Sequence, residues 1–451
     1  MQKQLFGTDG IRGVAGQYPL DPATVFAFGL ALADDARRAH ANPEILIGAD
    51  TRESSSWIAE MVAGGLARGG AAVRYAGVIT TPGIAFLTRS GPFVAGVMIS
   101  ASHNPYRDNG LKVFGHSGFK LPDAEERAVE QEILSLVEAG VSPTPTRLAV
   151  DESLESQYIE YLLSTVTVRL DAVRLIVDCG NGASYRLAPE LFRRLGAQVT
   201  AIEAAPNGRN INLNCGAMHL GGLQHAVLAA AASSGPADFG VAFDGDADRA
   251  IFVAPSGRIV DGDSVLLAAA RALKSAGHLP GDIVVATVMS NLGLQQALER
   301  HGIRLLRAAV GDKYVLEEMV RTGAMLGGEQ SGHVIFREYA TTGDGMLTAL
   351  RLFEIARCCA MSLDELTADF QAFPQKLVNI PVRQKKDFAD MPGVAREISL
   401  LEQRMGSAGR VLVRYSGTEL LARVMVEASE QEVVDTGTAR IAEAIRREIG
   451  V

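Results

Sequence analysis

Residues 239–249 read FGVAFDGDADR, an apolar run of five residues that ends abruptly in a turn with three carboxylates. The run is short enough for a buried strand of a parallel sheet. Comparable apolar runs, most of them leading into a polar turn or a helical pattern, occur at EILIGA (Glu44–Ala49), FVAGVMI (Phe93–Ile99), LIVDC (Leu175–Cys179) and IVVATV (Ile283–Val288). Repetition of strand, turn and helix predicts α/β units with mostly parallel sheets. Ligands of such folds bind at the carboxyl ends of the strands, where these polar turns fall.

Three breaks in this pattern predict four domains. The first is the Pro/Thr segment VSPTPTR (Val141–Arg147), the second lies near Pro255–Gly257, and the third lies near Phe373–Pro374. After the third break the chain changes character, because three strand-like runs are followed by one closing helix. We therefore expect three similar α/β domains with mixed or parallel sheets and a smaller α+β domain at the C-terminus. Their predicted bounds are residues 1–148, 149–255, 256–372 and 373–451.

The composition restricts the possible functions. The 451 residues are 47% hydrophobic, enough for full cores, and the formal net charge of −9 argues against general nucleic-acid binding. The N-terminus lacks an apolar signal-peptide core, and no window approaches the ~18 apolar residues that cross a bilayer. We expect a cytoplasmic protein with reduced thiols, because the cysteines have no metal-ligand spacing. They are Cys179, Cys215, Cys358 and Cys359.

The acidic turn predicts a site for a hard cation. Asp244, Asp246 and Asp248 alternate along DGDADR, so their carboxylates repel one another unless a cation neutralises them. A calcium-binding EF-hand loop would need Gly at its sixth position and Glu at its twelfth, where this chain has Arg249 and Pro255. The EF-hand is therefore excluded, and Mg²⁺ is favoured where a phosphate supplies a further oxygen. A solvated acidic turn capped by Arg249 is the alternative interpretation.

A candidate nucleophile follows the apolar run at Phe93–Ile99. In the sequence SASHNP, Ser102 precedes His103 and Asn104, and Pro105 cannot continue a central strand, so the loop turns outward. A serine hydroxyl among polar groups suits covalent phosphoryl catalysis. An ordinary structural turn is one alternative. A serine hydrolase is another, although no G-x-S-x-G elbow surrounds this serine.

Two further turns offer groups for a phosphorylated sugar. In GGEQSGH (Gly327–His333), Glu329 and Ser331 offer hydrogen bonds to hydroxyls, and His333 could act as acid or base. In RYSGTE (Arg414–Glu419), the guanidinium, the hydroxyls and the backbone NH groups could wrap a phosphate. Lys313 of VGDKY could also meet an anion, and so could the Gly-rich turn of FGTDGIRG, which holds Asp9 and Arg12. Taken singly, each motif is also consistent with an ordinary turn.

In combination these motifs resemble one family, the α-D-phosphohexomutases. FGTDGIRG, ISASHNPYRDNGLKVF, DGDADR, GGEQSGH and RYSGTE occur in this order over nearly the whole chain. The resemblance implies four domains around a central cleft and an enzyme in which Ser102 carries a phosphoryl group. Gln330, the segment NGRNINLNCGAMH (207–219) and VGDKY favour the branch that acts on glucosamine phosphates. Lys313 and Leu420 depart from the Arg and Pro that are usual in that branch.

The resemblance also implies a role for each candidate residue. One Mg²⁺ ion would bind Ser102, through its phosphoryl oxygen, together with Asp244, Asp246 and Asp248. The implied catalytic residues are Ser102, Lys112, Arg12 and His333, and either Lys112 or His333 could accept the proton. The implied substrate-binding residues are Glu329, Ser331, Lys313, Arg414, Ser416, Gly417, Thr418 and Arg423.

An isomerase activity follows from this resemblance, with a hexose 1,6-bisphosphate as intermediate and activator. The expected partners are small phosphosugars and a second copy of the chain in a homodimer, without nucleic acid or membrane. A mutase of glucose or mannose phosphates with the same mechanism is the alternative inside the family. Outside it, a serine hydrolase would be independent of Mg²⁺, and a non-catalytic sugar-phosphate binding protein would tolerate loss of Ser102.

Overall fold

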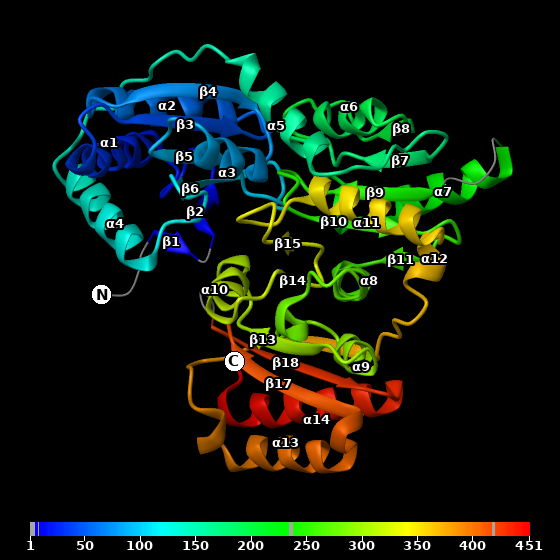
Figure 1. Ribbon diagram of the computed structural model, residues 1–451. Coiled ribbons are helices and arrows are strands. Elements are labelled where there is room, and N and C mark those ends of the chain that lie inside the picture. Colours follow the sequence, from blue (N-terminus) through cyan, green and yellow to red (C-terminus); the bar gives the residue numbers. More distant parts are fainter. Residues whose placement is uncertain (1–4, 8, 234–237, 417–419) are drawn as a thin grey trace. The chain divides into compact units, whose positions relative to one another are not determined.

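The computed structural model describes residues 5–7, 9–233, 238–416 and 420–451 (Figure 1). These residues form two compact units, each described here by itself. The first comprises Met1–Met289 and Ile303–Ala368, and the second comprises Ser290–Gly302 and Asp369–Val451. The described part of the first unit contains three sheets, and that of the second unit contains one.

The N-terminal sheet of the first unit has the strand order β1-β2-β6-β5-β3-β4. Strand β3 pairs in parallel with β4 and β5, and the other neighbours are antiparallel. Buried strand residues such as Ile45 and Val97 share one apolar core with Phe28 and Val62 of the helices. The elements are β1 (Phe6–Gly7), β2 (Gly10–Val14), α1 (Pro22–Ala39), β3 (Glu44–Ala49), α2 (Ser55–Arg68), β4 (Ala72–Val78), α3 (Thr81–Ser90), β5 (Ala95–Ile99), β6 (Asp108–Gly115) and α4 (Asp123–Glu138).

The second sheet has the order β11-β10-β9-β7-β8, with β7, β8 and β9 parallel and β10 and β11 antiparallel. All five residues of β9 and all four of β10 are buried, so the centre of this sheet is covered on both faces. The elements are α5 (Glu152–Ser164), β7 (Arg174–Asp178), α6 (Leu187–Arg194), β8 (Gln198–Ile202), a 3₁₀ turn (Gly216–Met218), α7 (Gly221–Ser233), β9 (Phe239–Phe243), β10 (Ala250–Val253) and β11 (Ile259–Val260).

The third sheet has the order β13-β12-β14-β15, and only the pair β14–β15 is antiparallel. Helix α10 begins after Gly311 and ends before Gly323, whose φ of +77° is the left-handed conformation usual for a glycine after a helix. The elements are α8 (Gly262–Ser275), a 3₁₀ turn (Pro280–Asp282), β12 (Ile283–Thr287), β13 (Arg304–Ala308), α10 (Asp312–Thr322), β14 (Leu326–Gly328), β15 (Val334–Phe336), α11 (Gly345–Cys359) and α12 (Leu363–Leu366).

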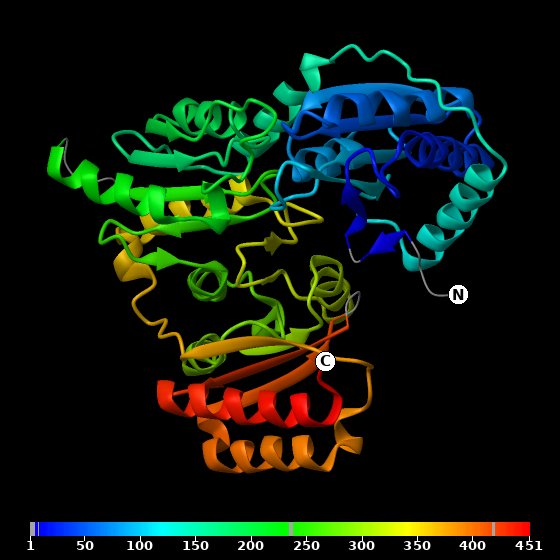
Figure 2. The same cartoon turned by 180° about the vertical axis from the view of Figure 1, so that it is seen from behind.

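The second unit is built on an antiparallel sheet of order β16-β18-β17. Helices α13 and α14 pack against each other and cover the same side of this sheet, as the front and back views agree (Figure 2). The elements are α9 (Leu292–Arg300), β16 (Gln375–Pro381), a 3₁₀ turn (Phe388–Asp390), α13 (Pro392–Met405), a 3₁₀ turn (Gly406–Ala408), β17 (Gly409–Tyr415), β18 (Leu421–Ala428) and α14 (Gln431–Ile449).

The apolar runs predicted the strands closely. EILIGA and FGVAF coincide with β3 and β9, and the α/β class with a smaller C-terminal α+β domain is confirmed. The sheets are of the mixed kind, because β6, β10 and β15 return antiparallel beside parallel strands. The two glycines of GGEQSGH belong to β14. The predicted domain bounds stay a prediction. No helix within the described ranges is long and apolar enough to cross a bilayer.

The crossing of α1 and α2 leads to the first prediction. A Cβ at Gly29 would lie 2.2 Å from the carbonyl oxygen of Val62, so Gly29→Ala forces the two helices apart. We expect a loss of about 1–3 kcal/mol in unfolding free energy, measured as a lower melting temperature by circular dichroism. Gly222→Ala in α7 is the control, because a Cβ there meets no atom within 4 Å. Equal melting temperatures for the two variants would contradict this packing.

Candidate active site

Ser102 lies just beyond the carboxyl end of β5, as the apolar run predicted. Its φ of +52° falls in the left-handed region, which a buried serine adopts only when its surroundings hold it there. The residue is 1% exposed, and its Oγ donates a hydrogen bond to Asp244 Oδ2 at 2.6 Å. The candidate nucleophile therefore contacts the acidic turn of the second sheet directly.

The acidic turn follows β9 and brings its three carboxylates together. One oxygen from each of Asp244, Asp246 and Asp248 lies within 4.8 Å of the others, and all three residues are buried. Within the described residues, Asp246 Oδ1 and Asp248 Oδ1 have no hydrogen-bond partner. A buried carboxylate oxygen without a donor is costly unless a cation binds it. The turn therefore fits a hard divalent cation that takes oxygen ligands.

The electrostatics of this turn are dominated by burial and by the nearby charges. Burial, followed by the charges of Asp248 and Asp246, raises the pKa of Asp244 well above its usual value. Burial alone would also raise the pKa of Asp246, but the Lys112 ammonium at 2.8 Å lowers it below the usual range. The repulsion among the three carboxylates therefore acts mainly on Asp244. This carboxylate also accepts the hydrogen bond from the Ser102 hydroxyl.

Lys112 and Arg12 supply the positive charge beside Ser102. They lie on the paired strands β6 and β2, and Arg12 Nη1 donates to the carbonyl oxygen of Ala101 at 3.4 Å. Burial would lower the pKa of Lys112, but Asp246, Asp9 and Asp248 raise it. Lys112 is therefore a cation, suited to hold phosphoryl oxygens, and it has no lone pair with which to accept a proton.

The predicted sugar loop carries Glu329, Ser331 and His333 between β14 and β15. Glu329 Oε1 accepts a hydrogen bond from the backbone N of Gly311 at 3.2 Å, and Ser331 is half-buried. His333 is 2% exposed, and its Nε2 accepts from the backbone N of Gly343 at 3.1 Å. In the neutral ring this bond leaves the proton on Nδ1, which has no partner within the described residues. His333 is thus arranged to donate a hydrogen bond from Nδ1.

Gly332 fastens the sugar loop to the strand that follows the acidic turn. Its φ is +92°, and a Cβ would lie 2.5 Å from the carbonyl oxygen of Ala250. This close approach allows the backbone N of Ala250 to donate to the carbonyl oxygen of Gly332 at 3.1 Å. The structure therefore brings the sugar loop next to the acidic turn, as the combination of motifs implied.

Lys313 is paired with carboxylates of α4. Its Nζ pairs with Asp123, lies 3.5 Å from Glu126 Oε2 and donates to the carbonyl oxygen of Leu121 at 3.1 Å. A role for Lys313 in substrate binding stays a prediction.

The second unit gathers cations at one end of its sheet. Arg414 of β17 lies directly opposite Arg423 of β18, and burial followed by the Arg423 charge lowers the pKa of Arg414. Arg423 Nη2 is 3.5 Å from Ser416 Oγ, and Lys385 Nζ donates to the carbonyl oxygen of Ser416 at 2.7 Å. Like charges opposite each other are unfavourable unless an anion joins them, so this end fits a phosphate. The predicted residues Gly417 and Thr418 lie outside the described residues.

Sequence reasoning did not single out two residues that hold Ser102 in its left-handed conformation. Arg52 Nη2 donates to the carbonyl oxygen of Ser102 at 3.1 Å and also to that of Asn104. Asn212 Nδ2 donates to the same Ser102 oxygen at 2.9 Å. Arg52 pairs in turn with Asp50, which directly follows β3. The sequence signal for Arg52 was the polar turn after EILIGA. The signal for Asn212 was the segment NGRNIN, which we used only as evidence for the family resemblance.

Comparison with protein families agrees with this architecture. The models of the phosphoglucomutase/phosphomannomutase family match in order: alpha/beta/alpha domain I at residues 3–139, domain II at 156–257, domain III at 261–373 and the C-terminal domain at 377–444. The chain therefore belongs to this family of phosphohexomutases. The family and the class of enzyme expected from the motifs are confirmed.

Relatives of higher sequence identity indicate which branch of the family the chain resembles. The chain is 68% identical over 450 residues to the phosphoglucosamine mutase of Solibacter usitatus, with all of both chains covered. It is 50% identical to the phosphoglucosamine mutase of Koribacter versatilis, covering 100% of this chain and 98% of that protein. This branch is the one that Gln330 and the segment 207–219 favoured.

Solved structures show the same fold at low identity. A phosphoglucomutase/phosphomannomutase family protein from Burkholderia thailandensis superposes with a TM-score of 0.79 at 23% identity, covering 98% of this chain and 99% of that one. The N-acetylphosphoglucosamine mutase of Aspergillus fumigatus, in complex with GlcNAc-6P and magnesium, superposes with a TM-score of 0.67 at 19% identity, covering 99% of this chain and 96% of that one.

The unsatisfied oxygens of the acidic turn lead to the second prediction. Mg²⁺ at 100 times its dissociation constant should stabilise the protein by about 2.7 kcal/mol, seen as a higher melting temperature. Asp248→Asn should abolish this shift, because it removes the charge of a carboxylate whose Oδ1 has no hydrogen-bond partner within the described residues. Asp171→Asn, at a side chain that is 66% exposed, is the control and should keep the shift. An equal Mg²⁺ shift in both variants would place the cation elsewhere.

Proposed function

We propose that this chain is a phosphoglucosamine mutase, which interconverts glucosamine 6-phosphate and glucosamine 1-phosphate through a phosphorylated Ser102. The proposal is carried by the hydrogen bond from Ser102 Oγ to Asp244, because it sets a serine hydroxyl at the edge of a metal-binding turn. The 68% identity to a protein of this name supports the amino sugar over glucose or mannose. The product would feed the synthesis of UDP-N-acetylglucosamine and cell-wall precursors.

Two phosphoryl transfers account for the interconversion. In the first, the bond between phosphorus and Ser102 Oγ breaks as the C1 hydroxyl of glucosamine 6-phosphate bonds to phosphorus, giving the 1,6-bisphosphate. In the second, the bisphosphate has turned around, and Ser102 Oγ takes the 6-phosphoryl group and releases glucosamine 1-phosphate. Each transfer moves one proton from the attacking hydroxyl to the departing oxygen. A hexose 1,6-bisphosphate primes an enzyme whose serine is not phosphorylated.

The cations beside Ser102 are assigned to the transferring group. A phosphoserine carries roughly −1.5 to −2 charges, which Arg12 and Lys112 would offset on the side of the first sheet. Asp244, Asp246, Asp248 and a phosphoserine oxygen would hold Mg²⁺, which supplies a Lewis acid and a charge clamp when bound. The cations of the second unit are assigned to the phosphate that does not react. These are Arg414 and Arg423, together with Ser416, Gly417 and Thr418.

The sugar would be oriented by Glu329, Ser331 and His333. Glu329 and Ser331 offer hydrogen bonds to its hydroxyls, as the motif predicted. His333 is assigned the role of a hydrogen-bond donor, because the Gly343 amide occupies Nε2 and leaves the proton on Nδ1. A loose phosphoryl-transfer transition state places little demand on a base, so proton transfer to phosphoryl oxygens suffices. We further propose a cytoplasmic homodimer whose partners are small phosphosugars and not nucleic acids.

The activity test compares three sugars side by side. With Mg²⁺ and a hexose 1,6-bisphosphate, kcat/KM for glucosamine 6-phosphate should exceed that for glucose 1-phosphate and mannose 1-phosphate by about 100-fold or more. Ser102→Ala should abolish transfer of ³²P from labelled enzyme to sugar, whereas Ser90→Ala, at an exposed serine of α3, should not. A preference for glucose or mannose phosphate would assign the chain to the alternative branch. Normal turnover by Ser102→Ala would overturn the mechanism.

The assigned role of His333 predicts a particular order of variants. The amide nitrogen of Asn can occupy the position of Nδ1, whereas Ala offers no donor. His333→Asn should therefore keep kcat within about tenfold of the wild type, and His333→Ala should lose about 100-fold or more. Steady-state kcat for both variants is the measurement. Equally low kcat values would indicate that His333 acts as the base.

A further inference from the structure

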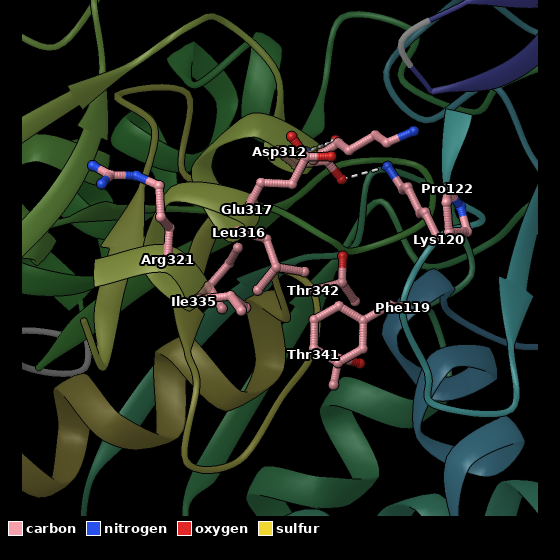
Figure 3. A pocket seen from close by; sticks show the side chains of 12 residues that line it. Phe119, Lys120, Pro122, Asp312, Leu316, Glu317, Arg321, Ile335, Thr341 and Thr342 are labelled. Carbon is pink, nitrogen blue, oxygen red and sulfur yellow. Dashed lines mark hydrogen bonds and ion pairs between the residues drawn. The ribbon is translucent and has the colours of Figure 1, made fainter. Parts of the chain in front are cut away.

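Lys120 is a largely buried cation shared by two carboxylates from distant parts of the chain. It follows β6 in a short bridge with Phe114, and its side chain is 11% exposed. Its Nζ donates to Asp9 Oδ1 of the β1–β2 segment and to Asp312 Oδ2 at the start of α10. Figure 3 shows the second contact beside the cavity described below. None of these three residues belongs to the predicted catalytic or binding set.

Each of the two carboxylates also lies close to a residue of the candidate active site. Asp9 pairs with Arg12 and lies 3.1 Å from Lys112 Nζ, which in turn reaches Asp246 at 2.8 Å. Arg12 and Lys112 are the two cations assigned to the transferring phosphoryl group.

On its other side, Asp312 Oδ2 is 3.6 Å from His333 Nε2 of the sugar loop. A row of alternating charges therefore runs from the acidic turn, through Lys112, Asp9, Lys120 and Asp312, to the sugar loop.

The row is charged throughout at neutral pH. Burial opposes ionisation of Asp9, but Lys112, Lys120 and Arg12 lower its pKa well below the usual value. Burial likewise opposes ionisation of Asp312, and Lys120 lowers its pKa. For Lys120 itself, Asp312 and Asp9 raise the pKa against the effect of burial. Removing the ammonium would leave two partly buried carboxylates facing each other, and each would move away from its present partners.

We propose that Lys120 is a positioning residue for phosphoryl transfer, holding Asp9 against Arg12 and Lys112 on one side and fixing Asp312, at the start of α10, beside the sugar loop on the other. The proposal rests on the proposed function, because it assigns these groups to phosphoryl and sugar binding. The Lys120 ammonium contacts Asp9 and Asp312, neither of which is a metal-binding residue. We expect the removal of Lys120 to misalign the reacting groups without removing any of them.

A cavity beside Lys120 provides a sharp test. Its volume is about 450 Å³, and its walls include Lys120 and Asp312 together with Phe119, Leu316, Ile335 and Thr342 (Figure 3). Truncation of Lys120 extends this cavity toward the carboxylates. A small primary alkylammonium ion is then able to enter and to place its charge between Asp9 and Asp312.

The experiment measures kcat and KM of Lys120→Ala with and without ethylammonium. We expect kcat to fall about 10- to 100-fold, with KM changed less than about threefold, because misaligned groups slow the chemical step. Ethylammonium should restore kcat in a saturable manner, whereas sodium chloride at equal ionic strength should not. Lys120→Arg should keep most of the activity.

Two further variants control for folding and for the cavity. Lys120→Met fills the space without a charge, so it should be as slow as Lys120→Ala but should not respond to ethylammonium. Arg321→Ala removes an exposed cation of the same cavity wall, which pairs with Glu318, and should leave kcat unchanged. The proposal is wrong if Lys120→Ala keeps wild-type kcat, or if ethylammonium restores nothing.

The choice of sugar separates this proposal from the proposed function. All variants are compared on whichever of the three hexose phosphates the wild type prefers. A preference for glucose or mannose phosphate would overturn the proposed substrate and leave the Lys120 comparison intact. Absence of turnover on all three sugars would overturn both.

Discussion

The repulsion among Asp244, Asp246 and Asp248 governs the surrounding structure, because three buried carboxylates in one turn need positive partners from elsewhere. The turn itself offers only Arg249. Lys112 arrives from β6, and Thr81, at the start of α3, donates its hydroxyl to Asp246. Two sheets of the first unit are thus joined through charge compensation as well as apolar contact. The same requirement explains why the nucleophile, the cations and the carboxylates come from separate segments of the chain.

The backbone around Ser102 shows which contacts stabilise the junction between these two sheets. A left-handed serine is unfavourable in isolation, and here its carbonyl oxygen accepts hydrogen bonds from both Arg52 and Asn212. A Cβ at Gly245 of the acidic turn would lie 2.5 Å from that oxygen, so glycine is needed for the approach. Several residues therefore fix the carbonyl group of Ser102 in the conformation from which its hydroxyl reaches Asp244.

Patterns of a few adjacent residues made part of this structure predictable. Runs such as FGVAF carry enough apolar character to define a buried strand, and the chemistry of DGDADR is visible because its carboxylates are neighbours. Asp9, Lys120 and Asp312 left no such signal, since 111 residues separate the first pair and 192 the second. The pairing of Lys313 with Asp123 and Glu126 was likewise invisible, because it depends on where the start of α10 meets the start of α4. Charge partners that meet only through tertiary packing are beyond local pattern reasoning.

The attachment of the sugar loop has a consequence for the substrate. Ala250, directly after the acidic turn, is bonded to Gly332, and Gly262 N donates to the carbonyl oxygen of Gln330 at 3.0 Å. The loop is thereby tied by its backbone to the segments that flank β10 and β11, so the spacing between metal-binding and sugar-binding groups is set by the fold. A frame of fixed spacing cannot adapt separately to the two half-reactions. In the proposed mechanism, the bisphosphate itself would therefore turn around, and recognition would rely on hydroxyls that both of its orientations present at equivalent positions.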